Sequence, residues 1–138
     1  MIWPLHHVDL VVSDLERSLA FYRELLGWTQ SGEIAGERGE RVVYIWPPGR
    51  ESAGSVGLRE RQSDAHPVPY DRYAVGIHHL AFETGSRDEV DERFAWLREW
   101  GAEIESEPRA YDYAPGYYAC FFYDPDGIKL ELVYQPRS

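Results

Sequence analysis

The sequence predicts an α+β protein made of two tandem βαβββ modules, and three observations lead to this class. First, an apolar-His-His-apolar strand start occurs twice, as Leu-His-His-Val at 5–8 and Ile-His-His-Leu at 77–80. Second, a helix start signal follows each of these histidine doublets by a few residues. Third, a Pro/Gly-rich turn precedes the last predicted strand of each half. One strand, one helix and three strands, repeated, make two similar modules.

In the first module, residues 5–12 are rich in Val and Leu and predict a strand. Ser13 is expected to cap the following helix by accepting from the backbone N–H of Glu16, and Gly27 to end it in a left-handed conformation. Three further strands are expected near 28–34, 40–46 and 54–60.

The second module repeats this order. A strand is expected at 76–83, a helix between Ser86 and Gly101, and strands near 102–106, 117–123 and 128–134. We therefore expect a single domain over 1–138, with module one at about 1–60, a polar linker at 61–75 and module two at about 76–138. Paired modules are expected to form one curved mixed sheet around a concave cup.

The composition limits the partners and the compartment that we expect for this protein. The 138 residues carry a formal net charge of −10, which argues against nucleic acid as a partner because phosphates would be repelled. The apolar runs are far too short to cross a membrane. A single cysteine suits a reducing compartment, so we expect a cytoplasmic protein.

Strand parity separates the histidines. Side chains alternate between the faces of a strand, so His7 and His79 are expected to face the cup, whereas His6 and His78 are expected to pack under the helices. Glu131 lies between Leu130 and Leu132 and should also face inward. Two imidazoles and one carboxylate on a shared wall are the ligand types of a divalent-metal site.

This pattern resembles the vicinal oxygen chelate superfamily, which includes glyoxalase I, extradiol dioxygenases, fosfomycin-modifying enzymes and bleomycin-resistance proteins. Residues 7–22, 79–82 and 124–132 carry the resemblance, in the expected order and spacing. It implies His7, His79 and Glu131 as ligands of a divalent metal ion (Fe, Mn, Zn or Ni). Gly57 stands where the resemblance places a fourth ligand, which departs from the four-ligand members.

The resemblance implies a metal-dependent small-molecule enzyme, either a lyase or isomerase or a ring-cleaving dioxygenase, whose substrate offers neighbouring oxygens to the metal. Glu131 and Tyr113, the latter from a tyrosine-rich loop at 111–118, are the candidate catalytic residues; Asp9 and Glu83 are further candidate bases. Thiol transfer to fosfomycin is a weaker expectation, because the inward-facing strands show no obvious cationic cluster. The alternative is a homodimeric drug-sequestering protein of the bleomycin-resistance type. A homodimer is expected in either case.

Overall fold

The computed structural model describes residues 1–50, 54–65 and 68–137. The chain divides into two compact units, Met1–Pro67 and Val68–Ser138, and the boundary between them lies within the segment 61–75. Each unit is described by itself. Within the described residues, no helix is long and apolar enough to cross a membrane.

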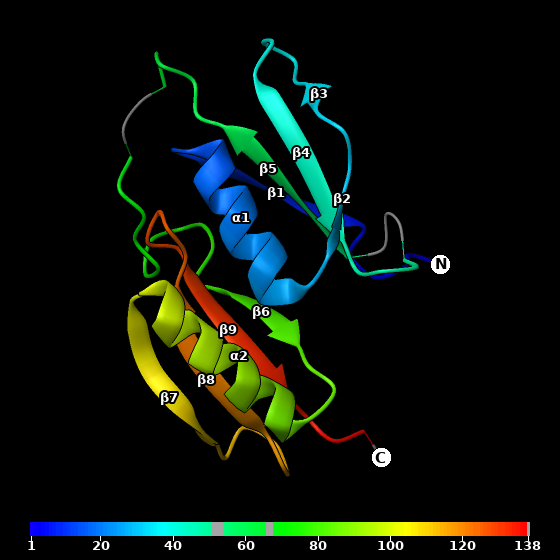
Figure 1. Cartoon of the computed structure of the whole chain (residues 1–138), viewed down its shortest axis with the longest axis vertical. Helices are drawn as coiled ribbons and strands as arrows, with labels where there is room; N and C mark the ends of the chain where they lie inside the picture. Colours follow the sequence, from blue (N-terminus) through cyan, green and yellow to red (C-terminus); the bar gives the residue numbers. More distant parts are fainter. Residues whose placement is uncertain (51–53, 66–67, 138) are drawn as a thin grey trace. The chain divides into compact units, whose positions relative to one another are not determined.

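The first unit is a mixed sheet with one helix along one face (Figure 1). The strand order is β1-β5-β4-β2, with β3 paired to β4; β1 runs parallel to β5 and the other pairs are antiparallel. Its elements are β1 (His7–Val12), α1 (Leu15–Leu26), β2 (Thr29–Gln30), β3 (Ile34–Ala35), β4 (Arg41–Trp46) and β5 (Ser55–Glu60).

The second unit repeats this topology. Its strand order is β6-β9-β8-β7, and again the first strand runs parallel to the last. Its elements are β6 (Leu80–Glu83), α2 (Arg87–Trp100), β7 (Ile104–Ala110), β8 (Tyr118–Tyr123) and β9 (Lys129–Tyr134). The α+β class and the twofold repeat are confirmed, while the strand pairing gives one sheet per unit where the sequence predicts one curved sheet.

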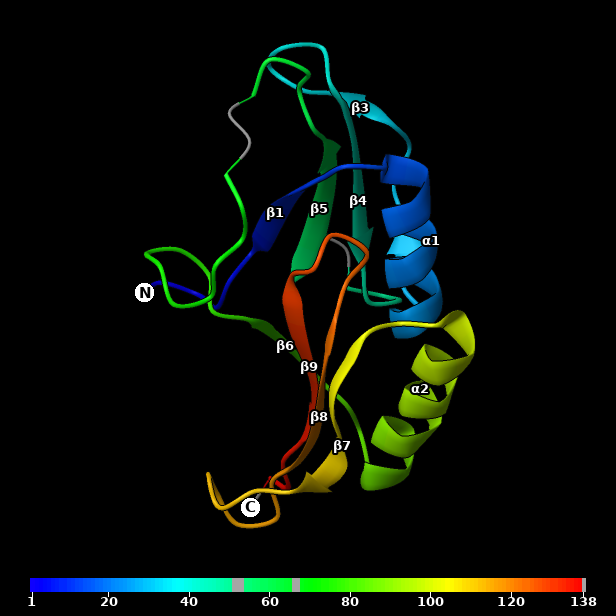
Figure 2. The same cartoon turned by 90° about the vertical axis from the view of Figure 1, so that its left-hand side faces the viewer.

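Each helix covers one face of its sheet and leaves the opposite face without a helix (Figure 2). On the covered faces, the strand residues alternate with open-face residues and pack against the buried stripe of the helix. The buried residues of these covered faces include Leu10, Val12, Phe21, Tyr22, Ile45 and Leu58 in the first unit, and Val90, Leu97, Cys120, Phe122, Leu130 and Leu132 in the second. The residues on the two open faces are therefore the ones available for binding.

The helix caps agree with the sequence except at one position. Ser86 accepts from the backbone N–H of Glu89 at 3.1 Å, and Gly27 and Gly101 end the helices at φ 67° and 87°, as predicted. The expectation that Ser13 caps α1 is wrong, because Asp14 is the cap and its carboxylate accepts from the backbone N–H of Arg17. Two capping residue types stand side by side there, and either fits the pattern.

Two predicted strands also differ from the structure. The segment 28–34 contains β2 and the first residue of β3, with a break at 31–33. Ser31 still contacts β4, because its N–H donates to the carbonyl of Tyr44 at 2.7 Å and its hydroxyl accepts from the Tyr44 N–H at 3.0 Å. The strand expected at 102–106 begins at Ile104 as part of β7. Ala102 is held by the helix end, where its N–H donates to the carbonyl of Leu97 at 3.0 Å.

Candidate functional site

The two histidine doublets share one geometry. His7 and Asp9 are exposed on the open face of the first sheet while Leu10 and Val12 are buried, which confirms the predicted parity within β1. The expectation that His6 and His78 pack under the helices is wrong. Both are exposed, and each Nδ1 contacts the Nδ1 of the next histidine, at 2.8 Å in the first doublet and 2.7 Å in the second.

The correction has a simple cause. β1 begins at His7 and β6 begins at Leu80, so His6 and His78 precede the regular strands in which side chains alternate. Outside the strand, each ring turns toward its neighbour instead of toward the helix. Partial desolvation lowers the pKa of the His78 imidazole, and the positive charge of Lys129 adds to this effect.

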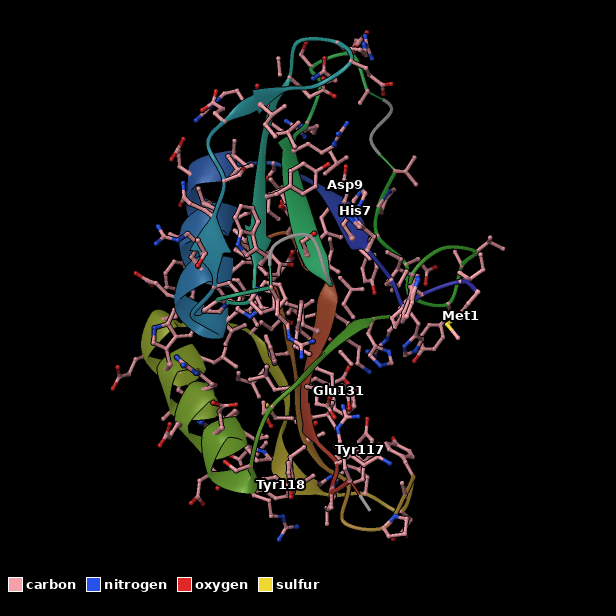
Figure 3. The ribbon with its side chains drawn as sticks, turned by 90° about the vertical axis from the view of Figure 1, so that its right-hand side faces the viewer. Met1, His7, Asp9, Tyr117, Tyr118 and Glu131 are labelled. Carbon is pink, nitrogen blue, oxygen red and sulfur yellow. The ribbon has the colours of Figure 1, made fainter. Side chains whose placement is uncertain are left out.

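Glu131 is the most deeply buried carboxylate among the described residues, with only 2% of its surface exposed. It lies in the middle of β9, paired with Ala81 on β6 and Phe121 on β8. His79 Nε2 lies 3.0 Å from one carboxylate oxygen, and the hydroxyl of Tyr117 donates to the other at 2.5 Å. Figure 3 labels Glu131 and Tyr117 on this face of the second unit.

Tyr117 is a partner that the sequence did not single out from the tyrosine-rich loop. Burial, reinforced by the hydrogen bond to Glu131, raises the pKa of the Tyr117 phenol well above its usual value. The phenol therefore stays protonated at neutral pH and acts as a donor. Tyr117 and Glu131 are 14 residues apart, and their contact depends on how the loop 111–117 folds back on β9. The sequence around either residue does not specify this path.

Tyr113, the predicted catalytic tyrosine, lies at the outer end of the same cluster and is 68% exposed. Its ring stacks on Tyr111 with centroids 5.1 Å apart and meets Tyr117 edge-on. Tyr111 and Tyr117 in turn pack against Ala119, Phe121 and Val133. This arrangement keeps Tyr113 beside Tyr117 and leaves most of its surface accessible.

Gly57 occupies the position of the first module that corresponds to Glu131. Asp9, two residues after His7, pairs with Gly57, just as Ala81, two residues after His79, pairs with Glu131. A Cβ atom at Gly57 would lie 2.3 Å from the Asp9 carboxylate and 2.6 Å from the Tyr44 ring. The Asp9 carboxylate thus occupies the space that a side chain at 57 would need.

Asp9 is held by polar neighbours on the same open face, where it and His7 both project from β1 (Figure 3). The Tyr44 hydroxyl donates to its carboxylate at 3.2 Å, Arg59 Nε lies 3.1 Å away, and His7 Nε2 lies 3.8 Å away. Arg59 also pairs with Glu40, so two carboxylates compensate its charge. Glu83, the other candidate base, is exposed and pairs with Arg137.

A pocket of about 410 Å³ opens beside His7 within the first unit. Its aromatic wall brings Tyr44 edge-on to the His7 ring, with centroids 5.6 Å apart. The lining residues are His6, His7, Ser31, Ile34, Tyr44, Trp46 and Ser55. Their character suits an apolar or aromatic body with a few polar groups.

The donor chemistry of this region fits a divalent metal. Ligands about 2.1 Å from a metal and at right angles lie about 3.0 Å apart, which matches the separation of His79 Nε2 and Glu131. Within the described residues, no group of three His, Cys, Asp or Glu side chains gathers closely enough to hold an ion. His7 lies in the first unit and the pair His79–Glu131 in the second, so the three-ligand set stays a prediction.

The chain is similar in sequence and in structure to several known proteins. The chain is 35% identical to the uncharacterised protein YwkD of Bacillus subtilis, over 98% of this chain and 99% of that protein. It is 28% identical to the metallothiol transferase FosB of Staphylococcus saprophyticus, over 96% and 77%. A glyoxylase/bleomycin resistance protein/dioxygenase domain from Frankia sp. EAN1pec superposes with a TM-score of 0.83 at 25% identity, covering 100% of this chain and 96% of that one.

A family model matches residues 4–132, which span both units and every candidate ligand. The match extends from the first histidine doublet to the middle of β9, the same stretch over which the βαβββ unit repeats. The chain belongs to the glyoxalase/bleomycin resistance protein/dioxygenase superfamily.

Proposed function

We propose that this protein is a metal-dependent small-molecule enzyme of the glyoxalase type, in which His7, His79 and Glu131 hold a divalent metal ion. Such a metal supplies Lewis-acid stabilisation to a substrate that presents two neighbouring oxygens. Fe, Mn, Zn and Ni all suit imidazole and carboxylate ligands, so the identity of the ion is left to experiment.

The observation that carries this proposal is the buried pair of His79 and Glu131. A carboxylate that is 2% exposed is costly to bury without a cation, and among the described residues its ion-pair partner is His79, not a lysine or arginine. A bound divalent ion would supply the compensating charge. The relationship to a metallothiol transferase supports a metal in this family.

The surrounding residues have distinct roles in the proposal. Tyr117 donates to the Glu131 oxygen that His79 does not contact and fixes the rotamer of the carboxylate. Asp9 is the better placed base, because its carboxylate projects from β1 on the same face as His7. Tyr113, exposed beside Tyr117, donates a hydrogen bond to the substrate from the loop. Glu131 serves as the base only if it leaves the metal.

We place lyase or isomerase chemistry on an uncharged substrate ahead of ring cleavage and thiol transfer. Among the described cations of the open faces, Arg59 is paired with Asp9 and Glu40, and Lys129 and Arg72 share the single carboxylate of Glu105. A substrate with a phosphonate or carboxylate would therefore have to compete with these carboxylates. An apolar body in the pocket beside His7 agrees with a neutral substrate.

Elemental analysis tests the metal site directly. Metal-free protein is dialysed against Fe(II), Mn(II), Zn(II) or Ni(II) without oxygen, and bound metal per chain is measured. We expect about one ion per chain in the wild type and in Glu83→Gln, and a large loss in Glu131→Gln and His79→Ala. A wild type that binds substantially less than one ion of any of the four metals would overturn the proposal.

An activity screen of the loaded protein then separates the reaction classes. A hemithioacetal, a catechol with oxygen, and fosfomycin with a thiol represent isomerase, dioxygenase and transferase chemistry. We expect turnover of the hemithioacetal class. Turnover of the catechol or of fosfomycin alone would move the assignment to that class and leave the metal site standing.

Drug sequestration is the second candidate, and the aromatic pocket beside His7 together with the net charge of −10 favours it. An acidic protein with an aromatic pocket suits a cationic aromatic drug. Titration calorimetry of metal-free protein with bleomycin measures this binding. Tight binding without metal, unaffected by His79→Ala, would support sequestration over catalysis.

A further inference from the structure

In each histidine doublet the two rings contact each other, although the proposed metal site uses only the second histidine of each pair. The Nδ1 atoms lie 2.8 Å and 2.7 Å apart, the ring centroids 5.1 Å and 5.0 Å, and the ring planes meet at 79° and 75°. The surroundings differ, since His7 meets Tyr44 edge-on whereas His79 meets Phe121. The geometry is therefore a property of the doublet itself.

A hydrogen bond between two neutral imidazoles at Nδ1 constrains both tautomers. One Nδ1 must carry the proton and donate, and the other must be unprotonated and accept. Because a neutral imidazole carries one ring proton, the accepting ring is protonated at Nε2. Each doublet therefore contains one Nδ1–H ring and one Nε2–H ring.

In the second doublet, the carboxylate of Glu131 determines which histidine carries its proton on Nδ1 and which on Nε2. His79 Nε2 lies 3.0 Å from Glu131, so in metal-free protein this nitrogen carries the proton and donates to the carboxylate. His79 Nδ1 must then accept from His78. A metal ion requires the lone pair of Nε2, so on binding the proton of His79 has to lie on Nδ1, which donates to His78.

We propose that His6 and His78 are positioning residues that orient His7 and His79 for metal binding, and that His78 exchanges tautomer with His79 when the metal binds. This rests on the proposed function. The protons balance: the Nδ1 proton passes from His78 to His79 along their contact, His79 Nε2 gives its proton to solvent, and His78 Nε2 takes one from solvent. His6 and His7 share the ring contact, but His7 Nε2 lies 3.8 Å from Asp9, so the exchange is proposed for the second doublet and orientation alone for the first.

Tautomers in metal-free protein test the pairing without any metal. Nitrogen-15 NMR of the imidazoles, at a pH where they are neutral, distinguishes Nδ1–H from Nε2–H. We expect His78 as Nδ1–H and His79 as Nε2–H. In His79→Phe, His78 should revert to the Nε2–H form that isolated imidazoles favour. Finding His78 as Nε2–H in the wild type would overturn the inference.

Zinc(II), which is diamagnetic, then tests the exchange. On loading, His79 should become Nδ1–H with a metal-bound Nε2, and His78 should become Nε2–H. Stoichiometric zinc without a change in His78 would overturn the inference while the proposed function stands. No zinc uptake, with the metal-free tautomers as expected, would overturn the proposed function and the metal-linked exchange, and leave the pairing of the rings established.

Metal affinity distinguishes orientation from mere ring packing. His78→Phe keeps a ring and loses the nitrogen, and we expect zinc to bind roughly 10- to 100-fold more weakly, as for the loss of other partners that orient a metal-bound histidine. His78→Asn places an amide near the Nδ1 position and should restore most of the affinity. The pair His6→Phe and His6→Asn repeats the test in the first unit. Equal affinities for the wild type and both Phe variants would contradict the proposal.

Discussion

Gly57 shows how one residue can determine the chemistry of a module. The absence of a side chain there leaves room for the Asp9 carboxylate and the Tyr44 ring, at 2.3 and 2.6 Å from where a Cβ would lie. The first module therefore presents its carboxylate from β1, whereas the second presents Glu131 from β9. In the first module an acidic side chain therefore lies on the strand next to Gly57, in the space that a side chain at position 57 would need.

Gly57→Ala should destabilise the first unit, because the new methyl group overlaps Asp9 and Tyr44. We expect a loss of about 1–3 kcal/mol, typical of overpacking. Gly32→Ala is the matched control, since a Cβ there meets nothing within 4 Å. Urea unfolding of both variants measures the difference. Adding Asp9→Ala to Gly57→Ala should recover part of the loss, and strict additivity would contradict the overlap with Asp9.

Tyr117→Phe should remove a donor from buried Glu131 and cost about 1–3 kcal/mol. Tyr113→Phe changes an exposed tyrosine of the same loop and should stay within about 0.5 kcal/mol of the wild type. Thermal or urea unfolding of metal-free protein compares the two. Equal losses would mean that the Tyr117 hydroxyl contributes nothing specific.

At the scale of elements, Glu105 connects β7 to β8 and β9. The Tyr123 hydroxyl donates to its carboxylate at 2.7 Å, Lys129 Nζ lies 2.7 Å away, and Arg72 donates to the same group. Desolvation alone would raise the pKa of Glu105, but the hydrogen bonds from Lys129, Tyr123 and Arg72 outweigh it and lower this pKa to about 2.

The stabilisation from Glu105 should therefore depend on pH in the acid range. Because folding depresses this pKa, the contribution is present above the ordinary value of 4.5 and is lost as the pH falls toward about 2. Glu105→Gln should cost ~2 kcal/mol at neutral pH, and its difference from the wild type should shrink between pH 4.5 and 2. Glu107→Gln changes a carboxylate of β7 that is 69% exposed and pairs with Arg98, and it should show little of either effect. Unfolding curves across this pH range check the prediction.

The elements also show which features a sequence can predict. Periodicity placed His7 and Leu10 on opposite faces correctly, because both lie inside a regular strand. It failed for His6, which precedes the strand. The capping-box pattern failed for Ser13, because the adjacent Asp14 is the cap. The Tyr117–Glu131 contact depends on the path of a loop and on strand register, so neither residue's local sequence contains it.

At the scale of the whole molecule, the two units repeat one topology, and the chain carries a net charge of −10. We expect the protein to be a homodimer, as members of its superfamily commonly are. Two copies of an acidic chain repel each other, and salt screens that repulsion. Sedimentation velocity should therefore show a dimer whose association strengthens as ionic strength rises. A monomer at every salt concentration would contradict this prediction.

The two modules carry their carboxylates on different strands, Asp9 on β1 and Glu131 on β9, and this difference has a consequence for protein design. Because β1 and β5 are paired at Asp9 and Gly57, moving the acidic group from one strand to the next needs changes at these two positions and a smaller residue at Tyr44, whose ring lies 2.6 Å from where the new Cβ would be. Asp9→Ala combined with Gly57→Glu would make the first repeat match the second at the positions of Ala81 and Glu131. Such a variant would carry its acidic residue on the last strand of both modules. Comparing its metal binding with that of the wild type would show whether the different placement of the two carboxylates matters for binding.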